Sequence, residues 1–166
     1  MSVKGIATLA RQAIAAARRK RKTLATAESC TGGMVAVALT DVAGASGVFL
    51  GGFVTYSNAF KKRFLGTPAG MLNRYGAVSE ETARAMARGA QKKSKASVSV
   101  AVTGIAGPGG GSKEKPVGLV HFAVAERQGR KVSIRHEKQI FPNRGRAAVR
   151  RAATRHALTM LVQAIR

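Results

Sequence analysis

The chain has 166 residues, 45% hydrophobic and 22% charged, a balance that is typical of one globular domain and argues against intrinsic disorder. Its 29 Lys and Arg against 7 Asp and Glu give a formal charge of +22, which favours anionic partners of some kind. A lone cysteine, Cys30, excludes an internal disulfide, and we expect it to be a buried small hydrophobic residue.

Apolar residues recur at helical intervals in the first part of the chain and predict an amphipathic helix over residues 2 to 20. The basic run from 18 to 22 closes it. Cations at a helix carboxyl end interact favourably with its dipole, so we interpret this run as a solvated helix end. A nucleic-acid patch is the second reading, because no aromatic residues are interleaved with the charges.

Residues 23 to 27 predict a short strand, and a polar turn from 28 to 33 leads into a helix that ends near Thr40. Thr31 is expected to be the N-cap of this helix, with Glu28 near its positive end. Ser29 and Gly32 belong to the same turn. In α/β proteins such turns gather ligands at strand ends, so a substrate-binding role is preferred for the four residues.

A turn over residues 44 to 47 precedes a predicted strand from 48 to 55, and a short helix follows from 58 to 65. Ser46 lies before this strand, whereas Tyr56 and Lys61 lie after it. Within one straight element these side chains could not meet. A bulge at Gly51 and Gly52, or a second chain, would have to bring them together.

The middle of the chain predicts a short helix over 69 to 75 and a longer one from Ser79, its expected N-cap, to about 93. A third strand follows from 96 to Thr103. The loop from Thr103 to Gly111 then has five glycines among its nine residues. It is read either as a long flexible connection or as a segment whose backbone approaches a ligand.

The last third predicts antiparallel strands over 117 to 125 and 132 to 140 and a final helix over 146 to 165. Arg144 and Arg146 lie at the expected start of this helix, where backbone N–H groups also point outward. Because the two effects coincide, we expect a phosphate or other anion site there. Arg150 is predicted to share an exposed side of the helix with Arg146.

The three histidines, at positions 121, 136 and 156, lack metal-ligand spacing, so neither a metal site nor a metal cofactor is expected. No apolar run is long enough to span a bilayer, and no membrane association is expected. A serine nucleophile would need a base other than these histidines, and Lys61 is the candidate if its amine is neutral. From the residues alone, a solvated basic face at 61 to 63 remains the preferred reading.

Several ungapped stretches, in order along nearly the whole chain, resemble one known family. They are TAESCTGG, TYSNAFKKRFLG, GAVSEETA, TGIAGPGGGSKEKPVG and the FP…R…VR ending. The chain resembles the CinA C-terminal-domain family, which includes nicotinamide-nucleotide amidohydrolases. The resemblance implies one α/β/α domain over residues 1 to 166, with a mixed, mainly parallel sheet of about five strands. This is a CinA-like fold, also described as anticodon-binding-domain-like.

The activity that the resemblance implies is hydrolysis of nicotinamide mononucleotide to nicotinate mononucleotide and ammonia, without a cofactor or a metal. Carried onto matching positions, Ser46 becomes the nucleophile, Lys61 the base and Tyr56 a supporting hydroxyl. Thr103 and the adjacent Gly104 are expected to contact substrate or oxyanion.

The resemblance also implies an arginine that holds the substrate, which we expect to be Arg146. The spacing of the last motif departs from the family pattern by about one residue, so Arg144 and Arg150 remain alternatives for the arginine that holds the substrate. A cytoplasmic stand-alone form and a homo-oligomer, with a dimer favoured, are further expectations. The alternative is a basic nucleic-acid-binding or competence- or damage-associated protein with weak or no amidase activity. Nucleic acid would then bind through non-specific electrostatics.

The glycine loop is expected to form a wall of the amide-hydrolysis pocket. A bulky residue at Gly104 or Gly107 should then lower turnover far more than stability.

Overall fold

The computed structural model describes residues 5 to 166 and contains six α-helices, one 3-10 turn and five strands within that range. The elements in chain order are α1 (Ile6–Arg19), β1 (Leu24–Glu28), α2 (Met34–Thr40), η1 (Ala45–Gly47), β2 (Phe49–Val54), α3 (Asn58–Leu65), α4 (Ala69–Tyr75), α5 (Glu80–Ser94), β3 (Val98–Gly104), β4 (Leu119–Gln128), β5 (Lys131–Ile140) and α6 (Arg146–Ile165).

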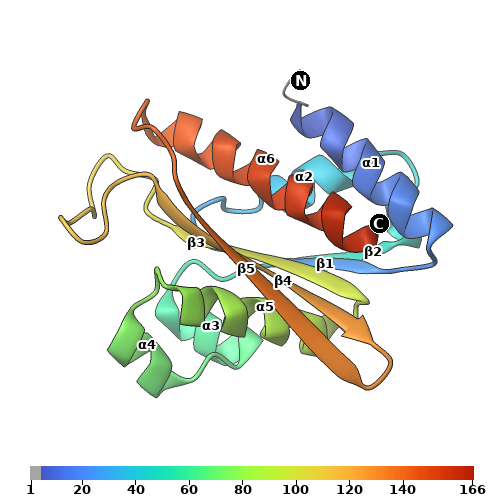
Figure 1. Cartoon of the computed structure of the whole chain (residues 1–166), viewed down its shortest axis with the longest axis horizontal. Helices are drawn as coiled ribbons and strands as arrows, with labels where there is room; N and C mark the ends of the chain where they lie inside the picture. The colour runs from blue at the N-terminus through green and yellow to red at the C-terminus, as the bar shows by residue number, and fades with distance from the viewer. Residues whose placement is uncertain (1–4) are drawn as a thin grey trace.

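The five strands form one sheet in the order β2-β1-β3-β4-β5. The pairs β1–β2 and β1–β3 are parallel, whereas β3–β4 and β4–β5 are antiparallel. Helices α1, α2 and α6 cover one face of this sheet and α3, α4 and α5 the other (Figure 1). The structure therefore confirms a three-layer α/β/α domain with a mixed five-stranded sheet.

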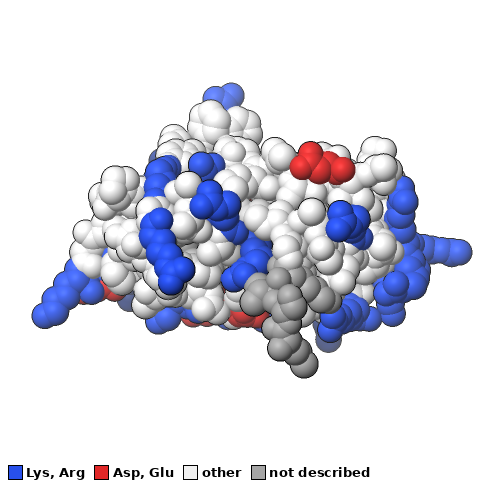
Figure 2. Space-filling model, turned by 90° about the horizontal axis from the view of Figure 1, so that it is seen from above, with Lys and Arg blue, Asp and Glu red and all other residues white. Residues whose placement is uncertain are grey.

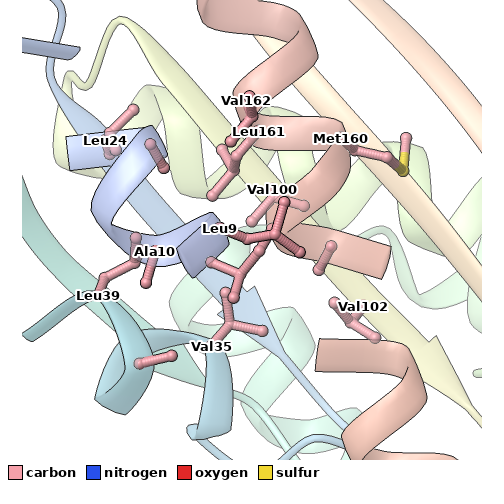
Figure 3. Close-up of a cluster of buried hydrophobic side chains, with 14 of the residues drawn as sticks. Leu9, Ala10, Leu24, Val35, Leu39, Val100, Val102, Met160, Leu161 and Val162 are labelled. Atoms are coloured by element: carbon pink, nitrogen blue, oxygen red, sulfur yellow. The ribbon is translucent and has the colours of Figure 1, made fainter. Parts of the chain in front are cut away.

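The larger core lies between the sheet and the layer of α1, α2 and α6. Figure 3 shows Leu9 and Ala10 of α1 and Leu161 of α6 meeting above Val100 and Val102 of the central strand β3. A smaller core on the other face packs α5 against alanines of β1, β3 and β4. Small side chains on this face let α5 lie close to the sheet.

The periodicity predicted most elements within about two residues. Ser79 caps α5 as expected, since its hydroxyl accepts a hydrogen bond from the Thr82 N–H at 3.2 Å. The predicted core side of α6 is also confirmed, with Ala153, Leu161 and Ile165 fully buried. The expected start of the first helix at residue 2 lies outside the described residues. Over residues 5 to 166, no helix is both long and apolar enough to cross a membrane.

Candidate active site at the carboxyl ends of the parallel strands

The three parallel strands end side by side. Glu28, the last residue of β1, pairs with Val54 of β2 and Val102 of β3. Backbone hydrogen bonds continue the register beyond the strands: the Ser29 N–H donates to the Val102 carbonyl and the Thr55 N–H to the Glu28 carbonyl, both at 2.9 Å. The turns that follow the three strands thus share one edge of the sheet, where ligands bind in open α/β folds.

Lys61 reaches back from α3 into this edge and is fully buried. Its Nζ lies 2.8 Å from the Thr55 carbonyl oxygen, 3.2 Å from the Tyr56 carbonyl oxygen and 3.2 Å from Ser29 Oγ. A neutral amine has two hydrogens and one lone pair. The two carbonyls can accept the two hydrogens, which directs the lone pair toward the Ser29 hydroxyl.

The environment of Lys61 favours its neutral form. Burial lowers the pKa of the Lys61 ammonium from 10.5 to about 8, because the charged form loses its hydration. With a pKa near 8, about a tenth of the side chains are neutral at pH 7. Lys61 is therefore not part of a solvated basic face, and it is able to accept a proton from a neighbouring hydroxyl.

The expected pairing of Ser46 with Lys61 is wrong in this structure. Ser46 is exposed in the η1 turn that precedes β2, whereas Lys61 follows the opposite end of that strand. A strand of six residues keeps the two ends about 20 Å apart. The register between β1 and β2 is irregular near the start of β2, but this irregularity does not fold the strand back. The hydroxyl beside Lys61 belongs to Ser29.

Glu28 caps the helix that follows this turn. One carboxylate oxygen accepts hydrogen bonds from the Gly33 and Val35 N–H groups at 3.0 Å, and the other accepts one from the Ala36 N–H at 2.9 Å. Its side chain is fully buried beneath the amino end of α2. The predicted capping role of Thr31 is therefore wrong, because the Glu28 carboxylate already accepts from these N–H groups. Within residues 5 to 166, the buried Thr31 hydroxyl has no hydrogen-bond partner.

Arg150 fixes the turn from the side of α6. Its Nε donates to the Cys30 carbonyl and a terminal nitrogen donates to the Thr31 carbonyl, both at 3.0 Å. A side chain on Gly32, whose φ is +60°, would lie 3.1 Å from this guanidinium. The prediction that Arg150 shares an exposed side of the helix with Arg146 is wrong, because Arg150 is half-buried and holds the backbone next to Ser29.

Arg146 joins two other parts of the site. Its guanidinium donates to the Tyr56 hydroxyl at 2.7 Å and to the Gly107 carbonyl at 2.9 Å. Tyr56 is 59% exposed, so its hydroxyl lies at the surface and contacts Arg146. Arg144 is exposed just before α6, as expected for a side chain at the helix start.

Thr103 and Gly104 are the last two residues of β3, and Thr103 is fully buried. The Thr103 hydroxyl donates to the Ala77 carbonyl at 2.7 Å, so it holds the chain before α5. A Cβ on Gly104 would lie 2.8 Å from the Leu119 carbonyl oxygen and 2.9 Å from Val120 Cα. These are backbone atoms of β4, which cannot move aside without a substantial cost in free energy. In contrast to the expectation that a bulky residue at Gly104 lowers turnover far more than stability, these contacts predict a substantial loss of stability as well.

Cys30 is buried as predicted, and burial raises the pKa of its thiol to about 12. The thiol is therefore not a competing nucleophile beside Ser29. Residues 5 to 166 contain no group of three or more His, Cys, Asp or Glu side chains placed to hold a metal ion.

Sequence reasoning assigned Ser29 to substrate binding and missed its contact with the lysine. A signal for that contact was present. Ser29 directly follows a strand and Lys61 follows another strand, so both belong to the same sheet edge if those strands are parallel neighbours.

The chain matches the family model of the CinA C-terminal domain over residues 6 to 165. It is 53% identical over 142 residues to a CinA-like protein of Akkermansia muciniphila, covering 86% of this chain and 33% of that protein. It is 47% identical over 154 residues to a CinA-like protein of Parasynechococcus marenigrum, covering 93% of this chain and 36% of that protein. The chain thus spans about a third of the length of these curated relatives.

Two solved structures share the fold over almost their whole length. The competence/damage inducible protein CihA from Agrobacterium tumefaciens superposes with a TM-score of 0.93 at 47% identity, with 100% of both chains covered. The competence damage-inducible protein A from Klebsiella pneumoniae gives a TM-score of 0.90 at 32% identity, with 96% of both chains covered. The family match, the sequence identities and the shared fold all cover most of this chain and point to the same family. The chain belongs to the CinA C-terminal-domain family.

Proposed function

We propose that this domain is an amidohydrolase in which Ser29 is the nucleophile and Lys61 the general base. The observation that carries the proposal is the buried Lys61 amine 3.2 Å from the Ser29 hydroxyl, with a pKa lowered to about 8. A serine hydroxyl becomes a useful nucleophile only when a nearby base takes its proton. Among the residues that the structure describes, Lys61 is placed to do so.

The proposed substrate is nicotinamide mononucleotide, which the family resemblance implies. Ser29 Oγ would attack the carboxamide carbon as its proton passes to Lys61. The protonated lysine would return that proton to the departing nitrogen, which leaves as ammonia. Water would then hydrolyse the acyl-enzyme ester and release nicotinate mononucleotide. The N–H groups of Cys30 and Thr31 are candidates for stabilising the oxyanion, because those of Gly32 and Gly33 already donate to Ser29 and Glu28.

The phosphate of this substrate would bind at the amino end of α6. Helix α6 has 20 residues and no side-chain cap, and Arg144 and Arg146 lie at its start. Open N–H groups and guanidinium ions together favour an anion. Arg146 also contacts the Tyr56 hydroxyl, so a phosphate held there would lie on the same side of the domain as Tyr56.

The test is ammonia release from nicotinamide mononucleotide by the purified protein and by two matched variants. We expect Ser29→Ala to lower kcat by at least about a thousandfold, a loss typical of removing a catalytic nucleophile. Ser46→Ala removes the same hydroxyl from an exposed turn and should keep wild-type turnover. Retained turnover in Ser29→Ala, or its loss in Ser46→Ala, would reject Ser29 as the nucleophile. An inactive wild type would reject the substrate.

A second candidate, non-specific binding of nucleic acid, is favoured by the +22 charge. Lys and Arg side chains are dispersed over the face that Figure 2 shows, with little acidic surface among them. A cavity of about 920 Å³ beside α5 is also lined by Arg84, Arg88, Lys92 and Lys93. Binding of an RNA that weakens steeply with salt, together with no ammonia release, would favour this candidate over the amidohydrolase.

A further inference from the structure

Helices α3, α4 and α5 cover the face of the sheet opposite α6 (Figure 1), and a cavity of about 920 Å³ lies among them. Three parts of the chain line it: helix α5, the end of α3 together with the start of α4, and strand β5. We call it the α5 cavity. Its volume falls within the range of about 300 to 1,000 Å³ that is typical of small-molecule sites.

The floor of the α5 cavity is apolar and continues the smaller core. Val132 and Ile134 of β5 pack against that core, yet both are only half-buried and line the cavity. Leu65 closes the cavity at the end of α3, where this helix lies so close to α5 that a Cβ on Gly89 would overlap the Leu65 carbonyl. The helices thus leave part of the apolar face of β5 uncovered. Apolar groups of a ligand would gain free energy by covering it.

Cations form a row along the α5 side of this floor. Arg84, Arg88 and Lys92 follow one another at intervals of four residues, so they lie on one side of the helix, and Lys93 lies beside them. Glu81 is the one acid among the described residues that line the cavity. Four cations and one acid give the lining a formal charge of +3, which favours an anionic ligand.

The helix dipole explains only part of this row. Lys92 and Lys93 lie in the last turn of α5, where cations interact favourably with the dipole. Arg88 lies in the middle of the helix and Arg84 in its first half, where this gain is absent. Within the part of the chain that the structure describes, the side chains of Arg88, Lys92 and Lys93 form no hydrogen bond or ion pair. An anion in the cavity would offset the repulsion among them.

Arg84 is already held in position. Its Nε donates to the Glu80 carboxylate at 2.7 Å and its Nη1 donates to the Ile134 carbonyl at 2.9 Å. A guanidinium has five N–H donors, so these two bonds use only part of its capacity. Because the side chain is fixed from both α5 and β5, it loses little conformational freedom when it binds a carboxylate or a phosphate.

The uncharged lining selects the rest of the ligand. It consists of aliphatic side chains, a methionine, a proline and two glycines. Of the described residues that line the cavity, none is aromatic and none carries an amide or a hydroxyl. A nucleobase is recognised by aromatic stacking and by polar contacts to its edge, which these side chains do not supply. A hydrocarbon chain needs only apolar contact.

We propose that the α5 cavity binds a small amphipathic anion, namely an unbranched hydrocarbon chain that ends in a carboxylate or a phosphate. The chain would cover Val132 and Ile134, and the anionic end would bind Arg84 and Arg88. A concave site suits a single molecule better than the surface of a bilayer. The inference does not rest on the proposed reaction, because the shape and the charge of the cavity stand without it.

Isothermal titration calorimetry of the full chain with decanoate, kept below its micelle concentration, tests the site. We expect decanoate to bind at one site per chain. Acetate has the charged end without the chain, and decyltrimethylammonium has the chain with the opposite charge, so both should bind far more weakly. Cosedimentation with phosphatidylglycerol vesicles tests a membrane lipid as the source of the same chemistry.

Three variants locate the binding site. Arg88→Ala should raise the dissociation constant for decanoate at least about tenfold, because a charge-assisted contact is lost. Ala85→Phe places a ring in the cavity without changing the charge and should weaken binding by at least about the same factor. Arg151→Ala removes an exposed arginine from α6, on the opposite face of the sheet. It is the matched control, and its dissociation constant should stay within about twofold of wild type.

Four results would overturn the proposal. Wild type might bind decanoate no better than acetate, Arg88→Ala and Ala85→Phe could both leave binding unchanged, or Arg151→Ala could weaken it equally. A wild type that binds vesicles through the cavity, so that Ala85→Phe abolishes cosedimentation, would assign the site to a membrane lipid instead. Circular dichroism of each variant verifies that it is folded. The readout is binding and not ammonia release, so failure of this site and failure of the proposed reaction are separate outcomes.

Discussion

Lys61 Nζ lies 3.2 Å from Ser29 Oγ, and the two residues are 32 positions apart in the chain. Two backbone carbonyls, of Thr55 and Tyr56, accept from the same amine. The contact depends on β1 and β2 being parallel neighbours, which brings the residue after β1 and the segment after β2 to one edge. A proton can pass directly between the two side chains.

The activity should rise with pH through about 8. Burial lowers the pKa of Lys61 to about 8, and only the neutral amine can accept the Ser29 proton. Below that pH, kcat/KM should fall about tenfold for each pH unit, because the neutral fraction falls in that proportion. Ammonia release measured across this range checks it. A profile that is flat between about pH 6 and pH 9 would show that no group with this pKa controls the reaction.

Folding stability should depend on pH through the same residue. Lys61 titrates at 10.5 in a model peptide and at about 8 in the folded protein. Between these values the unfolded chain binds more protons, so the free energy of unfolding rises with pH. Relative to Lys61→Met, which does not titrate, wild type should gain up to about 3 kcal/mol between pH 7 and pH 11. Denaturant unfolding of both proteins at each pH measures the gain, and parallel curves would contradict it.

Replacing Glu28 by Gln should destabilise the protein. The carboxylate accepts three backbone hydrogen bonds, and an amide can offer its oxygen to only some of these donors while its NH₂ group faces another. We expect a loss of about 2 kcal/mol in the free energy of unfolding. Glu126→Gln, at a partly exposed ion pair with Lys22, is a control in which the loss should stay within about 1 kcal/mol. Equal losses would argue against the capping role.

Arg146 and Arg150 should differ in their dependence on the substrate phosphate. Arg146→Ala should lower kcat/KM for nicotinamide mononucleotide about 10- to 100-fold, because a charge-assisted contact is lost, with little effect on nicotinamide riboside. Arg150→Ala should slow both substrates, since it loosens the turn that holds Ser29. Kinetics with the two substrates separate these patterns. If Arg146→Ala slows both equally, its role is to hold Tyr56 and Gly107 and not the phosphate.

Alanine at Gly104 should destabilise the fold, whereas alanine at Gly109 should not. A Cβ at Gly104 meets backbone atoms of Leu119 and Val120 within 3 Å, but one at Gly109 meets nothing within 4 Å. We expect Gly104→Ala to cost about 2 kcal/mol or more, a typical cost of overpacking. Thermal melts of the two variants provide the comparison. A Gly104→Ala protein that melts like wild type would show that β4 can move aside.

The sequence predicted the elements well because their signals are local. Apolar periodicity and capping residues such as Ser79 act within a few positions, and they define where helices begin and end. The pairing of Ser29 with Lys61 is different, since it depends on strand order, which no local pattern encodes. Gly104 is a similar case, because whether a side chain fits there depends on the neighbouring backbone of β4, which is distant in the sequence. Thr31 is a residue type that often caps helices, but the longer side chain of Glu28 accepts the hydrogen bonds of the helix start instead.

Glu28 has one more consequence, for where a substrate anion can bind. The amino end of a helix attracts a phosphate because its N–H groups lack acceptors. At α2 the chain supplies its own anion, a permanent internal ligand that holds the Gly33, Val35 and Ala36 N–H groups. An incoming phosphate would have to displace a carboxylate that is tethered to the protein. The two helix starts near the site therefore differ: the amino end of α2 is neutralised by the protein's own carboxylate, and the amino end of α6 is the one at which we propose that the substrate phosphate binds.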